Sequence, residues 1–332
     1  MLRLYASTAS TVDDRSQSIG YFSCGQAIGA ILGPVFQLAF SLLKFPGYQI
    51  YGLFNLNIYT APAYCAILAD IIGIIVLYTL FKEDYAGIVE KSIDDSCEKD
   101  NYKSMEVPKY DIVAVYVCLL TRFAHTFFLA NIETIGSAFS MHMFAFSHTK
   151  AVKYMAGSQT AVSILTFFVY LVFTLNNLKS INLRCICISS VKVMILFYLL
   201  TYSYPFYSGQ IKIRDASINI SHGCPADKFT WCKDLSLINV YLYYAVYVSI
   251  IGFAFPTLNI VLITLYSTVL GPRRQGTLQG IFQISGGTAR MLGPFVLGNL
   301  YDSHGPKMTW KLEFIVLGIT AVIWILFYHR MC

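Results

Sequence analysis

Long uncharged stretches alternate along the chain with short segments that hold most of its charged residues. A run of about 20 uncharged residues is long enough to cross the hydrocarbon core of a bilayer as a helix. The charges that bound these runs therefore predict eight membrane spans, at 17–42, 57–81, 111–135, 154–177, 185–206, 237–268, 277–300 and 312–328. The last span is the shortest, and the third contains three polar residues that titrate or carry charge: Arg122, His125 and Glu133.

One polar segment divides these spans into two and six. Residues 82–109 contain 13 of the 42 charged residues of the chain, a composition typical of a solvated linker. We therefore expect three regions: a remnant of a helix bundle at 1–81, a cytoplasmic linker at 82–109, and a six-helix bundle at 110–332.

Composition supports a membrane protein and argues against other classes. Hydrophobic residues make up 56% of the chain and charged residues only 13%, against roughly a quarter in soluble domains. Lysine and arginine are scattered, so the net charge of +6 does not predict nucleic-acid binding. We find no phosphate-binding loop, no His-Glu-x-x-His motif and no metal-ligand cluster around Cys185 and Cys187. We therefore expect no enzyme activity, cofactor or metal, and no cleaved signal peptide.

The loop at 207–236 indicates how the chain lies in the membrane. It contains the sequon Asn219-Ile-Ser together with Cys224 and Cys232. Glycans and disulfides both belong to the luminal or extracellular side, which would put both chain ends and the linker in the cytoplasm. The alternative is that the sequon arose by chance and that the two thiols are free.

A short repeat lies in the first and seventh spans. Shifting the chain by 260 residues aligns Leu32-Gly33-Pro34 with Leu292-Gly293-Pro294, and also Gly20 with Gly280. The repeat unit is therefore six helices in parallel orientation, which is the plan of the major facilitator fold. Either Gly-Pro pair alone is only a common helix kink; in this fold both are candidates for gating positions.

Several stretches resemble the major facilitator superfamily, and within it a lysosomal membrane family associated with neuronal ceroid lipofuscinosis. They are "RLYASTASTVDDRS", "CGQAIGAILGPVFQ", "IETIGSAFSMHMFAF", "LYSTVLGPRRQG" and "GGTARMLGPFVLGNLYDSHGP". The resemblance implies an all-α solute transporter of the lysosomal membrane that works by rocking-bundle alternating access. The same family has been linked to chloride conduction, so a channel-like activity is an alternative.

The resemblance also implies that the eight spans correspond to spans five to twelve of a twelve-span carrier. Arg3 would then match the end of the fourth span and line the substrate pathway. We expect either an incomplete sequence or a short isoform, and we expect the 332 residues alone to be an inactive product. A membrane receptor is the alternative from another functional class.

Charged residues inside spans are the strongest site candidates, because each costs several kcal/mol unless it faces protein or water. Arg122 and Glu133 lie about 20° apart on a helical wheel, so they share a polar stripe. This stripe predicts a cavity wall with a titratable carboxylate; the alternative is an ion pair that only fixes packing. His125 is a further pathway candidate in the same span.

Arg290 lies deep in the seventh span, where the first repeat copy has Ala30. An intramembrane arginine near a Gly-Pro pair favours an anionic or carboxylate-bearing solute, or an ion pair with Glu133, which could also exchange protons. Asn259 is a further pathway candidate in the sixth span, and Pro256 predicts a gating kink there, with simple bending as the alternative. The expected partners are thus a small solute or inorganic ion and the lipid bilayer.

Overall fold

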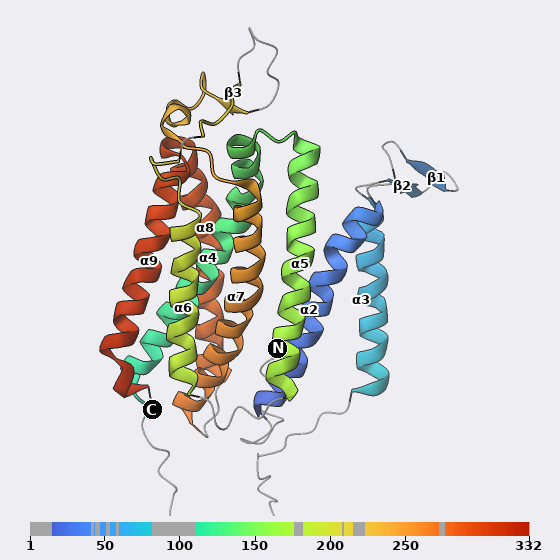
Figure 1. Ribbon diagram of the computed structural model, residues 1–332. Helices are drawn as coiled ribbons and strands as arrows, with labels where there is room; N and C mark the ends of the chain where they lie inside the picture. Colours follow the sequence, from blue (N-terminus) through green and yellow to red (C-terminus); the bar gives the residue numbers. More distant parts are fainter. Residues whose placement is uncertain are drawn as a thin grey trace, which may run out of the picture.

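Eight long helices form the described part of the computed structural model (Figure 1). The structure describes residues 15–40, 43, 47–50, 54–57, 60–81, 110–175, 182–207, 209–214, 223–271 and 276–331. The helices are α2 (Arg15–Phe40), α3 (Thr60–Leu80), α4 (Ile112–Phe144), α5 (His148–Leu175), α6 (Leu183–Leu200), α7 (Val240–Leu270), α8 (Gly276–His304) and α9 (Pro306–Leu326). Each of the eight predicted spans overlaps one of them. The all-α membrane fold is therefore confirmed.

Six of these helices are long and apolar enough to span a membrane by composition alone. They are α3, α4, α5, α6, α7 and α9. The other two, α2 and α8, contain the two copies of the Leu-Gly-Pro repeat. Both are rich in glycine and in small polar residues, which lowers their hydropathy but suits close helix packing.

Four short strands lie at one end of the bundle, which we call the strand end (Figure 1). There β1 (Tyr48–Ile50) pairs antiparallel with β2 (Phe54–Leu56), and β3 (Ile213–Arg214) pairs parallel with β4 (Cys224–Pro225). The chain also forms two short 3₁₀ helices, η3 (Thr230–Asp234) and η4 (Tyr328–Arg330). At the opposite end α3 stops, α4 starts and α9 stops.

The last helix begins earlier than its charges suggested. Gly305 has a φ of 76°, and Pro306 follows as the first helical residue, so α9 starts six residues before the predicted 312. Proline suits the first turn because the amide hydrogen that it lacks would have no helical partner there. The charge boundary at Lys311 therefore misplaced the start of this helix.

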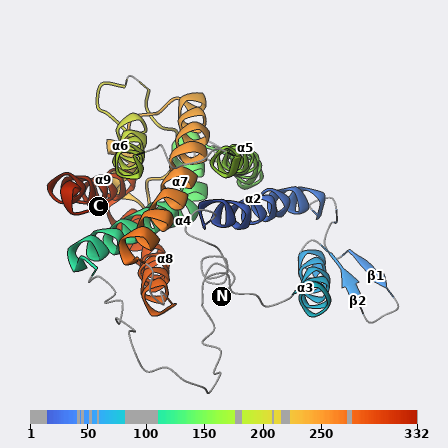
Figure 2. The same ribbon diagram turned by 90° about the horizontal axis from the view of Figure 1, so that it is seen from below.

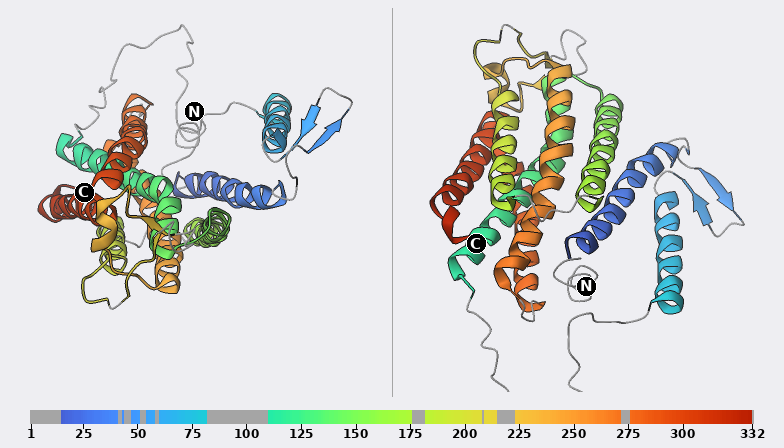
Figure 3. Two further views of the ribbon diagram at one scale, coloured as in Figure 1. Left: turned by 90° about the horizontal axis from the view of Figure 1, so that it is seen from above. Right: turned by 60° about the horizontal axis from the view of Figure 1, so that its bottom comes forward.

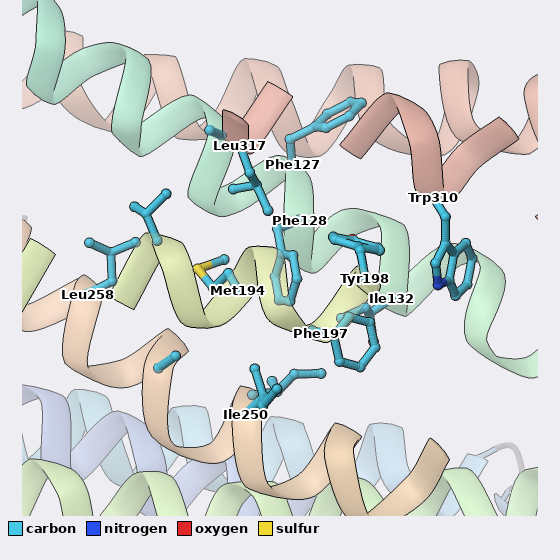
Figure 4. Close-up of a cluster of buried hydrophobic side chains, with 14 of the residues drawn as sticks. Phe127, Phe128, Ile132, Met194, Phe197, Tyr198, Ile250, Leu258, Trp310 and Leu317 are labelled. Carbon is cyan, nitrogen blue, oxygen red and sulfur yellow. The ribbon is translucent and has the colours of Figure 1, made fainter. Parts of the chain in front are cut away.

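The main hydrophobic core lies between α4, α6, α7 and α9. Phe128 of α4 meets Phe197 and Tyr198 of α6 edge to face, with ring centroids 5.8 and 5.5 Å apart, and Trp310 of α9 lies against Tyr198 (Figure 4). Lipid tails are as apolar as these side chains, so helices in a bilayer associate through close packing instead of through exclusion of water. Interlocking rings supply that packing here.

The two N-terminal helices lie to one side of this core. Viewed along the bundle from both ends, α2 lies beside α5, and α3 lies beyond α2 with β1 and β2 (Figures 2 and 3). Ala27 of α2 packs on Tyr170 of α5 and Ile260 of α7 in a small separate cluster. Within α3, Ala61 is the buried residue. The division at residues 82–109 falls outside the described residues and stays a prediction.

A disulfide joins Cys224 and Cys232 at the strand end. The neighbouring Trp231 packs on Gly305, where an added Cβ would lie 2.6 Å from the indole, and it donates a hydrogen bond to the Asp302 carbonyl oxygen. The disulfide therefore holds a segment that covers the junction of α8 and α9. The sequon Asn219 lies outside the described residues, and its glycosylation stays a prediction.

Replacing Cys224 with serine should loosen this segment. Opening so short a loop removes roughly 2 to 3 kcal/mol of stability by chain entropy, and we expect the melting temperature to fall by about 5 °C or more. Heating with intrinsic fluorescence, to which Trp231 contributes, measures the change. Cys65→Ser is the matched control, because Cys65 is an exposed free cysteine of α3. Equal melting temperatures for the two variants would show that the disulfide contributes nothing.

Candidate functional site

Close packing of α8 on α4 positions the candidate site. A Cβ added to Gly293 of α8 would lie 2.6 Å from the Cβ of Ala130 on α4. A Cβ on Gly286, two turns earlier, would lie 2.9 Å from the Arg122 side chain. Small residues at both positions let the two backbones approach closely. Arg290 lies between the two glycines, within a helical turn of each.

Arg290 and Glu133 form an ion pair between α8 and α4. The Arg290 Nη2 lies 3.1 Å from Glu133 Oε2 and donates to Oε1 at 3.3 Å. The side chains are 64% and 42% exposed, so both charges face an open side of the helix bundle. The structure thus brings together the two residues that the sequence singled out as partners. A partly exposed guanidinium can bind another carboxylate or anion in place of this one.

Two further polar residues lie near this pair and were not predicted. Tyr247 of α7 donates a hydrogen bond to the Gln159 Oε1 of α5 at 2.8 Å. The same tyrosine lies close enough to Glu133 for an electrostatic interaction. Both residues are neutral, so a search for charged residues inside spans passes over them. Tyr247 therefore adjoins the ion pair electrostatically, and Gln159 is linked to it through the Tyr247 hydroxyl.

Arg122 belongs to a different cluster. Its Nη1 donates to Asn259 Oδ1 at 2.9 Å, and the Asn259 amide donates to the Tyr170 hydroxyl at 3.1 Å. The guanidinium also lies over the Phe282 ring, 5.3 Å from its centroid. Eleven residues along a helix correspond to about 16 Å, so Arg122 is far from Glu133 along α4. The two ends of the predicted polar stripe therefore have different partners, Asn259 for Arg122 and Arg290 for Glu133, and the cavity wall stays a prediction.

His125 lies in the interior of the bundle. It is buried, its ring stacks on Phe255 with centroids 4.0 Å apart, and its Nε2 hydrogen-bonds the Phe255 carbonyl oxygen at 3.1 Å. The structure therefore places it between α4 and α7, apart from the Arg290–Glu133 pair. Arg3, the remaining pathway candidate, lies outside the described residues.

The predicted gating positions lie within continuous helices. Pro256 is buried inside α7, and Pro294 lies inside α8. Gly33 and Pro34 lie in α2, where Gly33 is exposed and a Cβ would meet nothing within 4 Å. Gly293, in contrast, lies in the tight contact with α4. The two repeat copies therefore share the Leu-Gly-Pro sequence but have different neighbours.

Glu313 was missed because the sequence placed it at the edge of the last span. It lies about two turns inside α9 and is fully buried, and its carboxylate oxygens have no hydrogen-bond partner among the described residues. Asn131 of α4 and Tyr198 of α6 face it, and the Asn131 amide donates to the Tyr198 hydroxyl at 3.2 Å. This carboxyl group lies in the bundle core and is separate from the exposed pair.

Comparison with known proteins identifies the type of protein. No model of a protein family matches the chain. The chain is 27% identical to major facilitator superfamily domain-containing protein 8 of Xenopus laevis over an alignment of 345 residues. The alignment covers 96% of this chain and 67% of the relative. The chain is therefore a multi-pass membrane protein that is similar, along nearly its whole length, to a major facilitator superfamily domain-containing protein.

Proposed function

We propose that the protein transports a small anionic or carboxylate-bearing solute by alternating access, in the lysosomal or endosomal membrane. The observation that carries the proposal is the ion pair between Arg290 and Glu133, which is partly exposed inside a predicted membrane span. A charge at this depth is costly, so a pair that faces open space instead of packed protein is expected to serve a ligand. The similarity to a major facilitator relative supports a transporter over an enzyme.

The pair suggests how binding is coupled to a proton. An entering anion competes with Glu133 for the Arg290 guanidinium, whose planar donors suit carboxylates and other oxyanions. Glu133 then loses its counter-charge, and a proton can take the place of the guanidinium. The anion and the proton would therefore bind together, and Tyr247 and Gln159 would supply hydrogen bonds that are selective for the solute.

The arrangement of the helices supports a rocking movement. The first repeat copy, α2, lies along α5, and the second copy, α8, lies along α4 with exposed apolar side chains such as Phe295 on its outer face. In parallel six-helix repeats, movement of one bundle against the other opens the central site to alternate sides of the membrane. Gly-Pro pairs within α2 and α8 would let these helices bend during the movement.

Ion conduction through a chloride channel is the second candidate, and the same fixed positive charge favours it. Transport by a carrier saturates as the anion concentration rises, whereas a channel conducts ions fast enough to give measurable unitary currents. Because we expect the 332 residues alone to be inactive, every proposed transport measurement uses a twelve-span carrier that contains them. In proteoliposomes this carrier should show saturable uptake of at least one of four probes, namely radiolabelled chloride, inorganic phosphate, acetate or succinate, and internal unlabelled anion should accelerate it. Unitary chloride currents across a planar bilayer, without acceleration by internal anion, would instead support the channel. Colocalisation of the expressed protein with a lysosomal marker tests the location.

A further inference from the structure

A groove lies between α6 and α9, whereas the Arg290–Glu133 ion pair joins α8 and α4. Its volume is about 290 Å³. Six of the residues that line it are Tyr198, Leu199, Tyr202, Trp310, Lys311 and Phe314. Because α6 ends and α9 begins at the strand end, the groove lies near that end of the bundle (Figure 1).

The inner wall of the groove presents aromatic rings without free polar atoms. Trp310 Nε1 donates to Thr201 Oγ1 at 2.9 Å, and the Tyr198 hydroxyl accepts a hydrogen bond from the Asn131 amide at 3.2 Å. Both polar groups are therefore used inside the bundle. On the outer side, Leu199 and Phe314 are about two-fifths exposed. These surroundings suit a hydrocarbon chain and offer a polar solute almost no hydrogen bonds.

A positive charge borders this apolar surface. Lys311 lines the groove and is exposed, and no ion pair involves it among the residues that the structure describes. Lys307, one turn earlier, donates to the carbonyl oxygen of Asp234 and adds a second cation on the same helix face. Tyr202 borders the same groove just beyond α6. Tyrosine, tryptophan and lysine together are typical of the depth at which lipid headgroups lie.

We propose that this groove binds a glycerophospholipid with a negatively charged headgroup. One acyl chain lies against Tyr198, Leu199 and Phe314, and the headgroup phosphate lies against Lys311. Charge complementarity argues for this occupant, because a headgroup with net negative charge balances Lys311, whereas a zwitterionic headgroup brings a positive charge of its own and an apolar helix brings no negative charge. The site is separate from Arg290 and does not depend on the proposed transport function.

Native mass spectrometry of the purified protein tests the proposal. The probes are palmitoyl-oleoyl phosphatidylglycerol and the matching phosphatidylcholine, added as mixed micelles in equal amounts. We expect wild-type protein to retain one phosphatidylglycerol with a preference of about five-fold or more over phosphatidylcholine, as expected for one lysine at the headgroup. Lys311→Ala should remove the preference. Leu199→Trp should fill the groove and lower retention of both lipids.

Lys212→Ala is the matched control, because Lys212 is exposed near β3 and does not line the groove. It should retain the lipids like wild type. Gel filtration checks that each variant remains folded, and Leu199 is exposed enough for a larger side chain to fit at the surface. Unchanged phosphatidylglycerol retention in Lys311→Ala would overturn the proposal, as would equal retention of both lipids by wild type. Crosslinking of a second protein to this groove, with no lipid retained, would also overturn it.

Discussion

Replacing Arg290 with alanine should lower anion uptake at least about 100-fold, because breaking a charge-assisted contact to a bound anion costs roughly 3 kcal/mol or more. The amount of folded protein should stay close to that of wild type, since Arg290 and Glu133 are 64% and 42% exposed and a partly solvated pair adds little stability. Initial uptake rates in proteoliposomes, normalised to reconstituted protein, measure the first effect. Gel filtration of the solubilised protein measures the second.

Two variants separate a binding role from a packing role. Arg290→Lys keeps the charge but loses the planar donors, so it should retain weak uptake with a raised half-saturating concentration. Arg330→Ala is the control, because Arg330 pairs with Asp111 at 4.0 Å close to the ends of α4 and α9 and outside the candidate site. It should transport normally. Loss of uptake that parallels loss of folded protein in Arg290→Ala would mean that the pair only holds α4 and α8 together.

Gly293→Ala should destabilise the protein through the contact between α8 and α4. The added Cβ would lie 2.6 Å from the Cβ of Ala130, a distance that forces the helices apart. Overpacking of this kind typically costs about 1 to 3 kcal/mol. Because Arg290 lies one turn away, uptake should fall as well. Thermal unfolding in detergent, followed by intrinsic fluorescence, measures the stability.

A compensating variant makes this prediction specific. In the double variant Gly293→Ala with Ala130→Gly, the clashing methyl group is removed from α4, and much of the lost stability should return. Gly298→Ala is the control on the same helix, because a Cβ there would meet nothing within 4 Å. If Gly293→Ala and Gly298→Ala melt at the same temperature, the close contact of α8 with α4 does not limit stability.

Much of the helical architecture could be predicted from charge spacing alone. Hydrocarbon disfavours charges, so the eight charge-poor runs correspond to the eight long helices. The predicted start of α9 at residue 312 was wrong, because the start of a helix follows local signals such as Gly305 and Pro306 more closely than it follows the positions of charged residues. Lysines in the first turns of a membrane helix can extend toward the headgroups, so Lys307 and Lys311 do not end it.

The candidate site was predictable only in part. Arg290 and Glu133 could be found because each would be costly alone, and pairing is the simplest way to lower that cost. Neither Tyr247 nor Gln159 carries a charge, so only the packing of α5 against α7 reveals them. The pairing of Arg122 with Asn259 could not be predicted from the sequence either. Asn259 was already a pathway candidate, but its hydrogen bond with Arg122 depends on how α4 and α7 cross.

The most direct test of the account is the rate at which the reconstituted protein exchanges anions across the membrane under an imposed proton gradient. Wild-type protein should accumulate at least one of the four probe anions when the side from which the anion enters is the more acidic. Glu133→Gln should still exchange that anion, since Arg290 remains, but the proton gradient should no longer drive accumulation. Equal proton-driven accumulation by Glu133→Gln, or normal exchange by Arg290→Ala, would contradict the proposal that these two residues bind and couple the transported anion.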